Sequence, residues 1–229
     1  MTLDTYRQKR DFKVSPEPAG SARAKAASQQ QRKYVIQKHR ATQLHYDFRL
    51  EFNGVLLSWA VPKGPSLDPS VKRLAMQVED HPIEYGGFEG VIPEGEYGGG
   101  TVMLWDNGVW SPEVPDIAAA LQKGDLKFRL DGKKLHGSWV LVRTRGFGGS
   151  DRSWLLIKHR DQYASTQDIV ADEPRSVKSK RLLAEIAQAG GGNVAKAATG
   201  DPVEPPPVPS KAPSRTKKPP AKKTAKARS

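Results

Sequence analysis

The chain of 229 residues contains no cysteine, which excludes disulfide bonds and thiolate metal sites. It also lacks any apolar run approaching the roughly 20 residues that a membrane-spanning helix requires. Residues 1–12 are charged and include no apolar segment of the kind found in secretory signals. Together these absences predict a soluble, cytoplasmic protein with no membrane partner.

Hydrophobic residues make up only 37% of the chain, and they are concentrated between residues 34 and 164. Positive charge lies at the ends instead: residues 1–33 carry +5 and residues 191–229 carry +7, out of a net +12. Basic terminal arms favour contact with a polyanion without sequence reading. We therefore expect a nucleoid-associated protein with nucleic-acid partners; the alternative is that the tails only keep the protein in solution.

Residues 33–164 alternate between short β-type segments and turn signals. The expected strands cover 34–36, 44–52, 55–61, 73–78, 101–105, 126–130, 137–143 and 154–158. The turns that separate them lie at 53–54, 62–65, 98–100, 107–108, 131–132 and 146–150. About eight short strands with little helix predict a mainly β fold, a closed or partly closed β-barrel, with a sandwich as the alternative.

The segments outside this β-rich domain differ from it in composition. Residues 1–32 are predicted to form an extended basic arm, because proline and small polar residues leave no apolar face. Residues 165–189 form a C-terminal extension with a short helix at 176–188. Residues 190–229 are rich in proline, alanine and lysine, which predicts disorder. One further short helix is expected at 116–123.

The most informative segment is the predicted strand at 44–52. Its alternate apolar residues define one face, so His45, Asp47 and Arg49 must share the other face, spaced about 7 Å apart at each step of two residues. His39 lies six residues before His45 and could approach the same face. Two histidines and an aspartate suit Mn, Zn, Fe or Co, and an arginine beside them suits phosphate oxygens. The alternative is an ordinary polar strand face with a His–Asp hydrogen bond.

A second polar segment, residues 79–85, lies where another predicted strand ends. His81 and Tyr85 could both reach one pocket from this junction. His81 could donate a proton to a leaving oxygen or hold phosphate as a cation, and Tyr85 could donate a hydrogen bond. The alternative is that His81 caps the turn and Tyr85 packs. The glycine-rich stretch that follows, residues 89–100, precedes a strand, so it predicts a hairpin and not a phosphate-binding loop.

Several segments together resemble the 3′-phosphoesterase domain of bacterial DNA ligase D. They are HRATQLHYDFRLE (39–51), WAVPKGPS (59–66), EDHP (79–82), FEGVIPEGEYGGG (88–100), WD (105–106), GSWVLVR (137–143) and WLLIKH (154–159). The arm sequence YRQKRDF (6–12), with Glu17 and Pro18, is also similar to the arm that precedes that domain. The resemblance covers roughly residues 4–164.

The resemblance implies a role for each matching residue. It implies metal ligands at His39, His45 and Asp47, usually holding manganese (Mn²⁺), with other divalent transition metals as alternatives. It further implies phosphate binding and catalysis by Arg49, His81 and Tyr85, contributions from Arg10, Asp11 and Glu17 of the arm, and phosphate contacts by Lys63 and Arg73. Members of the family remove a terminal ribonucleoside from a primer and then the remaining 3′-phosphate. The 3′-hydroxyl left behind serves non-homologous end joining.

Two departures from the family qualify this expectation. Gln43 stands where the family often has arginine, which would weaken the grip on the primer strand. The length of 229 residues cannot hold ligase and polymerase domains, so we expect a stand-alone version that works with a DNA ligase and a polymerase in trans. The alternatives are a non-catalytic DNA-end-binding module of the same fold and a phosphoesterase for small phosphate esters.

Overall fold

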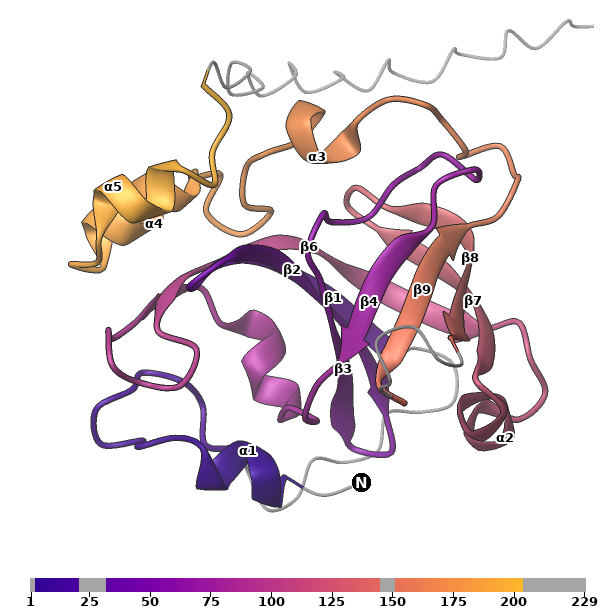
Figure 1. The fold of residues 1–229 in the computed structure, drawn as a ribbon, viewed down its shortest axis with the longest axis horizontal. Helices are drawn as coiled ribbons and strands as arrows, with labels where there is room; N and C mark the ends of the chain where they lie inside the picture. The colour runs from indigo at the N-terminus through magenta and orange to yellow at the C-terminus, as the bar shows by residue number, and fades with distance from the viewer. Residues whose placement is uncertain (1–2, 21–31, 145–150, 204–229) are drawn as a thin grey trace, which may run out of the picture.

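The computed structural model describes residues 3–20, 32–144 and 151–203 (Figure 1). The turn predicted at 146–150, residues 21–31 of the predicted arm and residues 204–229 of the predicted tail lie outside the described residues. Within the described part of the chain, no helix is both long and apolar enough to cross a membrane.

The described residues form a closed antiparallel β-barrel, which confirms the predicted fold class. Eight strands follow one another around the barrel in the order β1–β2–β3–β4–β9–β8–β7–β6, and β6 pairs back with β1. A further short strand, β5, pairs with the beginning of β6 as the predicted hairpin. The bounds are β1 Arg32–Arg40, β2 Leu44–Phe52, β3 Val55–Val61, β4 Arg73–Gln77, β5 Gly90–Ile92, β6 Gly100–Pro112, β7 Asp125–Gly132, β8 His136–Arg143 and β9 Ser153–Lys158.

Strand β2 shows how the sequence pattern determines the barrel. Tyr46, Phe48 and Leu50 point into the interior, where they belong to the main hydrophobic core. Asp47 and Arg49 point to the outer face, as the alternation requires. This outer face is buried too, because the N-terminal arm, the 3₁₀ helix η1 (Ile83–Gly87) and the β5–β6 loop lie over it (Figure 1). The strand therefore has a hydrophobic side and a buried polar side.

Strand β6 is longer than predicted, and the turn expected at 107–108 is wrong. The strand continues through Gly108 to Pro112 because Gly108 pairs with Tyr34 of β1 on one side and with Gly132 of β7 on the other. A Cβ atom at Gly108 would lie only 2.2 Å from the carbonyl oxygen of Asp131. The glycine therefore permits a close approach of two strands, a use that local sequence does not distinguish from a turn.

The helix predicted at 116–123 is confirmed as α2 (Ile117–Lys123). Asp116 caps its N-terminus by accepting a hydrogen bond from the backbone N–H of Ala119. Gly124 ends it in the left-handed conformation, with φ of 83°, which favours glycine. Buried Ile117 and Ala120 attach the helix to the core.

The C-terminal extension is more ordered than its composition predicted. It forms α3 (Ile169–Asp172), α4 (Leu183–Ala189) and α5 (Val194–Ala198). The helix expected at 176–188 thus begins later, and helix α5 lies within the segment predicted to be disordered. Leu183, Ile186 and Ala197 join the hydrophobic core, and the carboxylate of Asp201 accepts the first backbone N–H groups of α4. These contacts order residues up to 203.

The N-terminal arm also differs from the extended segment that was predicted. It contains a short helix, α1 (Asp4–Gln8), and residues 3–20 fold back over the barrel (Figure 1). Tyr6 is fully buried: its ring packs 4.9 Å from that of His81, and its hydroxyl donates to the carbonyl oxygen of Pro18 at 2.7 Å. A single buried aromatic residue thus anchors an otherwise polar arm.

Candidate metal and phosphate site

The three candidate metal ligands come together on the outer face of strands β1 and β2. His39 lies directly opposite His45 in the antiparallel register, and their ring centroids are 4.8 Å apart. Asp47 follows two residues later on the same face of β2. The side-chain Oδ2 of Asp47 lies 3.7 Å from Nδ1 of His39 and 3.6 Å from Nε2 of His45. The potential ligand atoms of all three lie within 4.8 Å of one another.

Hydrogen bonds to backbone carbonyls determine which ring nitrogens remain free. Nε2–H of His39 donates to the carbonyl oxygen of Gly98 at 2.8 Å, and Nδ1–H of His45 donates to that of Gln43 at 3.1 Å. The lone pairs of His39 Nδ1 and His45 Nε2 are therefore available on the side facing Asp47. Two lone pairs and a carboxylate repel one another unless a cation lies between them, so this donor set fits a divalent transition metal.

Charge around the ligands keeps the carboxylate ionised. Burial by itself would raise the pKa of Asp47, but the Arg49 guanidinium beside it holds that pKa well below its ordinary value. Burial opposes the charged form of His45, yet its contact with Asp47 and the carbonyl of Gln43 raise its pKa overall. Asp47 is thus ionised over the whole physiological range, as a candidate metal ligand should be.

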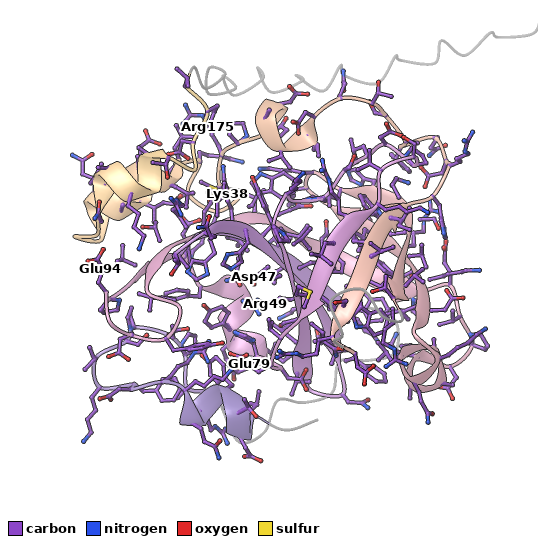
Figure 2. All side chains as sticks on the ribbon, viewed as in Figure 1. Lys38, Asp47, Arg49, Glu79, Glu94 and Arg175 are labelled. Carbon is purple, nitrogen blue, oxygen red and sulfur yellow. The ribbon has the colours of Figure 1, made fainter. Side chains whose placement is uncertain are left out.

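Arg49 is buried beside the ligands and held by three partners. Its Nε donates to Oε1 of Gln37 at 2.9 Å, one terminal nitrogen donates to Oγ of Ser58 at 2.7 Å, and the other lies 3.2 Å from Oδ2 of Asp47. Its guanidinium carbon also lies 5.0 Å from the ring centroid of Tyr85. Figure 2 shows Asp47 and Arg49 in the space between strand β2 and helix α1. A rigid, permanent cation at this place suits an anionic substrate group.

A second arginine, Arg10, reaches the same place from the arm. It pairs with Glu17 at 2.9 Å and with Glu79 at 3.5 Å, and its third nitrogen donates to Nε2 of His81 at 3.3 Å. Nδ1–H of His81 donates to the carbonyl of Glu79 at 2.9 Å. These bonds define the neutral tautomer of His81, with its lone pair on Nε2.

His81 and Tyr85 are both held in their neutral forms. Burial, together with the charges of Arg49 and Arg10, lowers the pKa of His81 well below its ordinary value. Burial raises the pKa of Tyr85 well above its ordinary value. In the free protein His81 is therefore not the phosphate-holding cation that the sequence suggested as one option, and Tyr85 keeps its hydroxyl proton.

These residues line a cleft of about 160 Å³. The lining residues are Arg10, Glu17, His39, Ala41, His45, Asp47, Arg49, Ala60, Val78, Glu79, His81, Tyr85, Ile92, Tyr97 and Gly98. Three other predicted site residues are not among them. Asp11 is exposed and accepts the backbone N–H of Lys13 at 2.9 Å, Lys63 is exposed beyond the end of β3, and Arg73 begins β4 opposite Leu156.

Two residues that position the site were not identified from the sequence. Gln37 is fully buried, pairs with Asp47 across the β1–β2 register, and donates from Nε2 to the carbonyl oxygens of Tyr85 and Phe88. It thereby connects Arg49 to helix η1. Glu79 connects Arg10 to the barrel. The sequence did contain a signal for Gln37. It is a polar residue two positions before His39, and alternate residues of a strand share a face.

Comparison with known families identifies residues 37–143 as a match to the family model described as "DNA Ligase D 3′-phosphoesterase domain". The matched region contains the metal-ligand cluster, Arg49, His81 and Tyr85. The arm and the C-terminal extension lie outside it.

Comparison with curated proteins finds long multifunctional relatives. The chain is 51% identical over 184 residues to the multifunctional non-homologous end joining protein LigD of Pseudomonas aeruginosa, covering 79% of this chain and 22% of the relative. It is 43% identical over 160 residues to the multifunctional non-homologous end joining DNA repair protein LigD of Mycobacterium tuberculosis, covering 70% of this chain and 20% of the relative. The chain thus spans about a fifth of the length of these relatives.

Proposed function

Because residues 37–143 are a DNA ligase D 3′-phosphoesterase domain, we propose that this chain is a manganese-dependent phosphoesterase of nucleic-acid 3′ ends. It removes 3′-terminal ribonucleosides and 3′-phosphates from primer ends and leaves 3′-hydroxyls during non-homologous end joining. The observation that carries the proposal is the convergence of His39, His45 and Asp47 on one point beside the buried Arg49.

His39 Nδ1, His45 Nε2 and Asp47 Oδ2 would hold the metal ion. Bound there, Mn²⁺ would supply Lewis-acid polarisation of a phosphoryl oxygen. Arg49 is adjacent and cannot lose its proton, so it binds the phosphate and offsets the charge that develops on it. Its three protein partners fix the guanidinium before substrate arrives.

His81 supplies the proton for the leaving oxygen in this proposal. Burial, together with the charges of Arg49 and Arg10, keeps it neutral in the free protein, and an entering phosphate group offsets those two charges, which raises the pKa of His81. A water oxygen forms a bond to phosphorus while the bond from phosphorus to the leaving oxygen breaks, and the water releases a proton to solvent. His81, protonated on Nε2, donates its proton to the departing oxygen. The Tyr85 hydroxyl remains protonated and donates a hydrogen bond to a phosphate oxygen.

Residues outside the cleft contact the rest of the strand in this proposal. Lys63 follows β3 and Arg73 begins β4, so they lie at the same end of two neighbouring strands, where they would contact phosphates further from the 3′ end. Asp11 would support the arm. A ligase and a polymerase of end joining would act on the same DNA ends, as partners of this domain.

The test uses a 5′-labelled primer with one 3′-terminal ribonucleotide. Incubated with Mn²⁺, the protein should first give the 3′-phosphate product and then the 3′-hydroxyl product on a sequencing gel, and EDTA should abolish both. Full activity in EDTA would refute the metal role. Binding of the primer without any cleavage, across a series of divalent metals, would favour the non-catalytic end-binding alternative.

A further inference from the structure

The cleft is too small to contain a nucleotide. Its volume of about 160 Å³ lies below the roughly 300–1,000 Å³ of pockets that enclose whole small-molecule ligands. It can therefore hold a phosphate group and its immediate surroundings, while the nucleobase of the same nucleotide lies outside, at the rim. A base left at the rim is either in water or against a side chain that stands there.

Tyr97 stands at that rim with a ring that is about half exposed and that also contacts the arm, because Nζ of Lys9 lies 4.5 Å from the ring centroid. It lines the cleft and is 48% exposed, whereas the other two tyrosines near the site, Tyr6 and Tyr85, are 0% and 2% exposed. Among the described residues, the other exposed large apolar side chains are Val14, Tyr163, Val194 and Val203, and none of them lines the cleft. The exposed part of the Tyr97 ring is therefore available to a group that extends out of the cleft.

The ring is also held in a defined place. The next residue, Gly98, accepts the hydrogen bond from His39, so the loop that carries Tyr97 is attached directly to a metal ligand. The Tyr97 hydroxyl accepts a hydrogen bond from Nζ of Lys9 at 3.1 Å, and Arg10 lies 5.5 Å from the ring centroid. Lys9 also pairs with Glu79 at 3.1 Å, so the contact with Tyr97 is one of two that attach Lys9 to the rim.

We propose that Tyr97 is a nucleobase-stacking platform for the nucleotide whose 3′ oxygen carries the phosphate in the cleft. This inference rests on the proposed function and adds a subsite to it. Every base presents a π-face, so stacking on an aromatic ring binds the end without reading its sequence. A stack of this kind typically contributes about 5- to 150-fold in affinity.

The experiment compares two oligonucleotides that carry a 3′-phosphate, one ending in an ordinary nucleotide and the other in an abasic deoxyribose. KM and kcat for phosphate release are measured with Mn²⁺ for the wild type, Tyr97→Ala and Tyr97→Phe. Tyr163→Ala is the matched control, because it removes an exposed tyrosine remote from the cleft. Binding of both oligonucleotides to the metal-free proteins is measured in parallel by fluorescence anisotropy.

Tyr97→Ala should raise KM for the base-containing end about 5- to 150-fold, with little change in kcat and little effect on the abasic end. Tyr97→Phe should stay near the wild type, because it keeps the ring and loses only the bond to Lys9. An equal loss on both ends, or no loss on either, would overturn the stacking role. If the wild type releases no phosphate, the proposed function fails, and the anisotropy measurements still decide whether Tyr97 binds a base.

Discussion

The two faces of strand β2 are both largely buried, but their side chains contact different kinds of partner. Tyr46, Phe48 and Leu50 point into the barrel and pack among aromatic rings, with Phe48 5.7 Å from Phe128 between centroids. Asp47 and Arg49 point outward and are almost as inaccessible to water. Burial therefore does not distinguish structural from functional residues in this protein. The difference lies in the partners: apolar contacts on one face, and charged groups with unshared lone pairs on the other.

The largest effect is expected from removing a metal ligand. His45→Ala leaves the Asp47–Arg49 ion pair in place but removes one of three ligands, so metal binding and turnover should both be lost. Stability without metal should change little, because the residue is partly exposed and surface substitutions usually stay within about 0.5 kcal/mol. Metal content, primer cleavage and thermal unfolding of the metal-free protein check this. His136→Ala, remote from the cleft, is the control; retained metal in His45→Ala would contradict the assignment.

On the opposite face of the same strand, Phe48→Ala should lower stability and leave metal binding unchanged. Deleting a fully buried aromatic ring typically costs about 3–5 kcal/mol of unfolding free energy, through lost burial and the cavity left behind. Denaturant unfolding measures the loss, and Phe48→Leu should lose less. In the conditions where the variant is folded, its metal affinity should stay close to that of the wild type. A variant that is stable but binds no metal would mean that the two faces are not separable.

Variants of Arg49 should distinguish residues that bind the phosphate from residues that bind the metal. Arg49→Ala should lower the single-turnover rate by about 10²–10³, the usual cost of removing one preorganised donor to a developing charge. Arg49→Lys keeps the charge but not the planar fork, so it should recover only part of that rate. Metal stoichiometry should remain that of the wild type in both variants. If metal is lost as fully as in His45→Ala, Arg49 acts through the ligands and not on the phosphate.

Removing one positive charge of the N-terminal arm should have a smaller effect, which is a shift in the pKa of His81. Arg10 is one of two cations that lower the pKa of His81, after burial, which is the largest cause. Arg10→Ala removes a positive charge, so the pKa of His81 should rise toward its ordinary value without reaching it. Proton NMR titration of the His81 ring in the metal-free protein measures this shift. Lys127→Ala, exposed on β7, should leave the titration unchanged; an unchanged titration in Arg10→Ala would show that burial alone controls His81.

The smallest effect should come from residues 204–229, which carry eight basic residues and one acidic residue. Deleting them should weaken binding to long DNA and flatten its dependence on salt, because fewer counterions are released. Turnover of a short primer at saturation should barely change, because binding contacts that do not strengthen in the transition state affect KM and not kcat. Binding isotherms at several salt concentrations measure the slope. An identical slope would mean that the tail does not contact the nucleic acid.

Predictions from the sequence were most accurate where a local pattern has only one structural solution. Strands β2 and β3 have the predicted bounds, because strict alternation and the Asn53-Gly54 turn define both. The helix at 117–123 was predicted from its sequence, and Asp116 and Gly124 cap it. The errors came where a residue has two uses. Gly108 is a strand residue in close contact with β7, and the polar sequences of residues 3–20 and 190–203 are ordered by a few buried side chains.

The sequence alone determined the mainly β class and the shared face of His45, Asp47 and Arg49, because a strand repeats every two residues and its apolar side must be buried. Closure into a barrel and not a sandwich is seen in the pairing of β6 with β1. Only the tertiary structure decided which distant groups complete that face. The carbonyl of Gly98 orients His39, Gln37 fixes Arg49, and burial together with the charges of Arg49 and Arg10 lowers the pKa of His81. It also left Lys63 and Arg73 outside the cleft. Tautomers, pKa values and cleft lining depend on contacts between segments far apart in the chain, which local spacing does not encode.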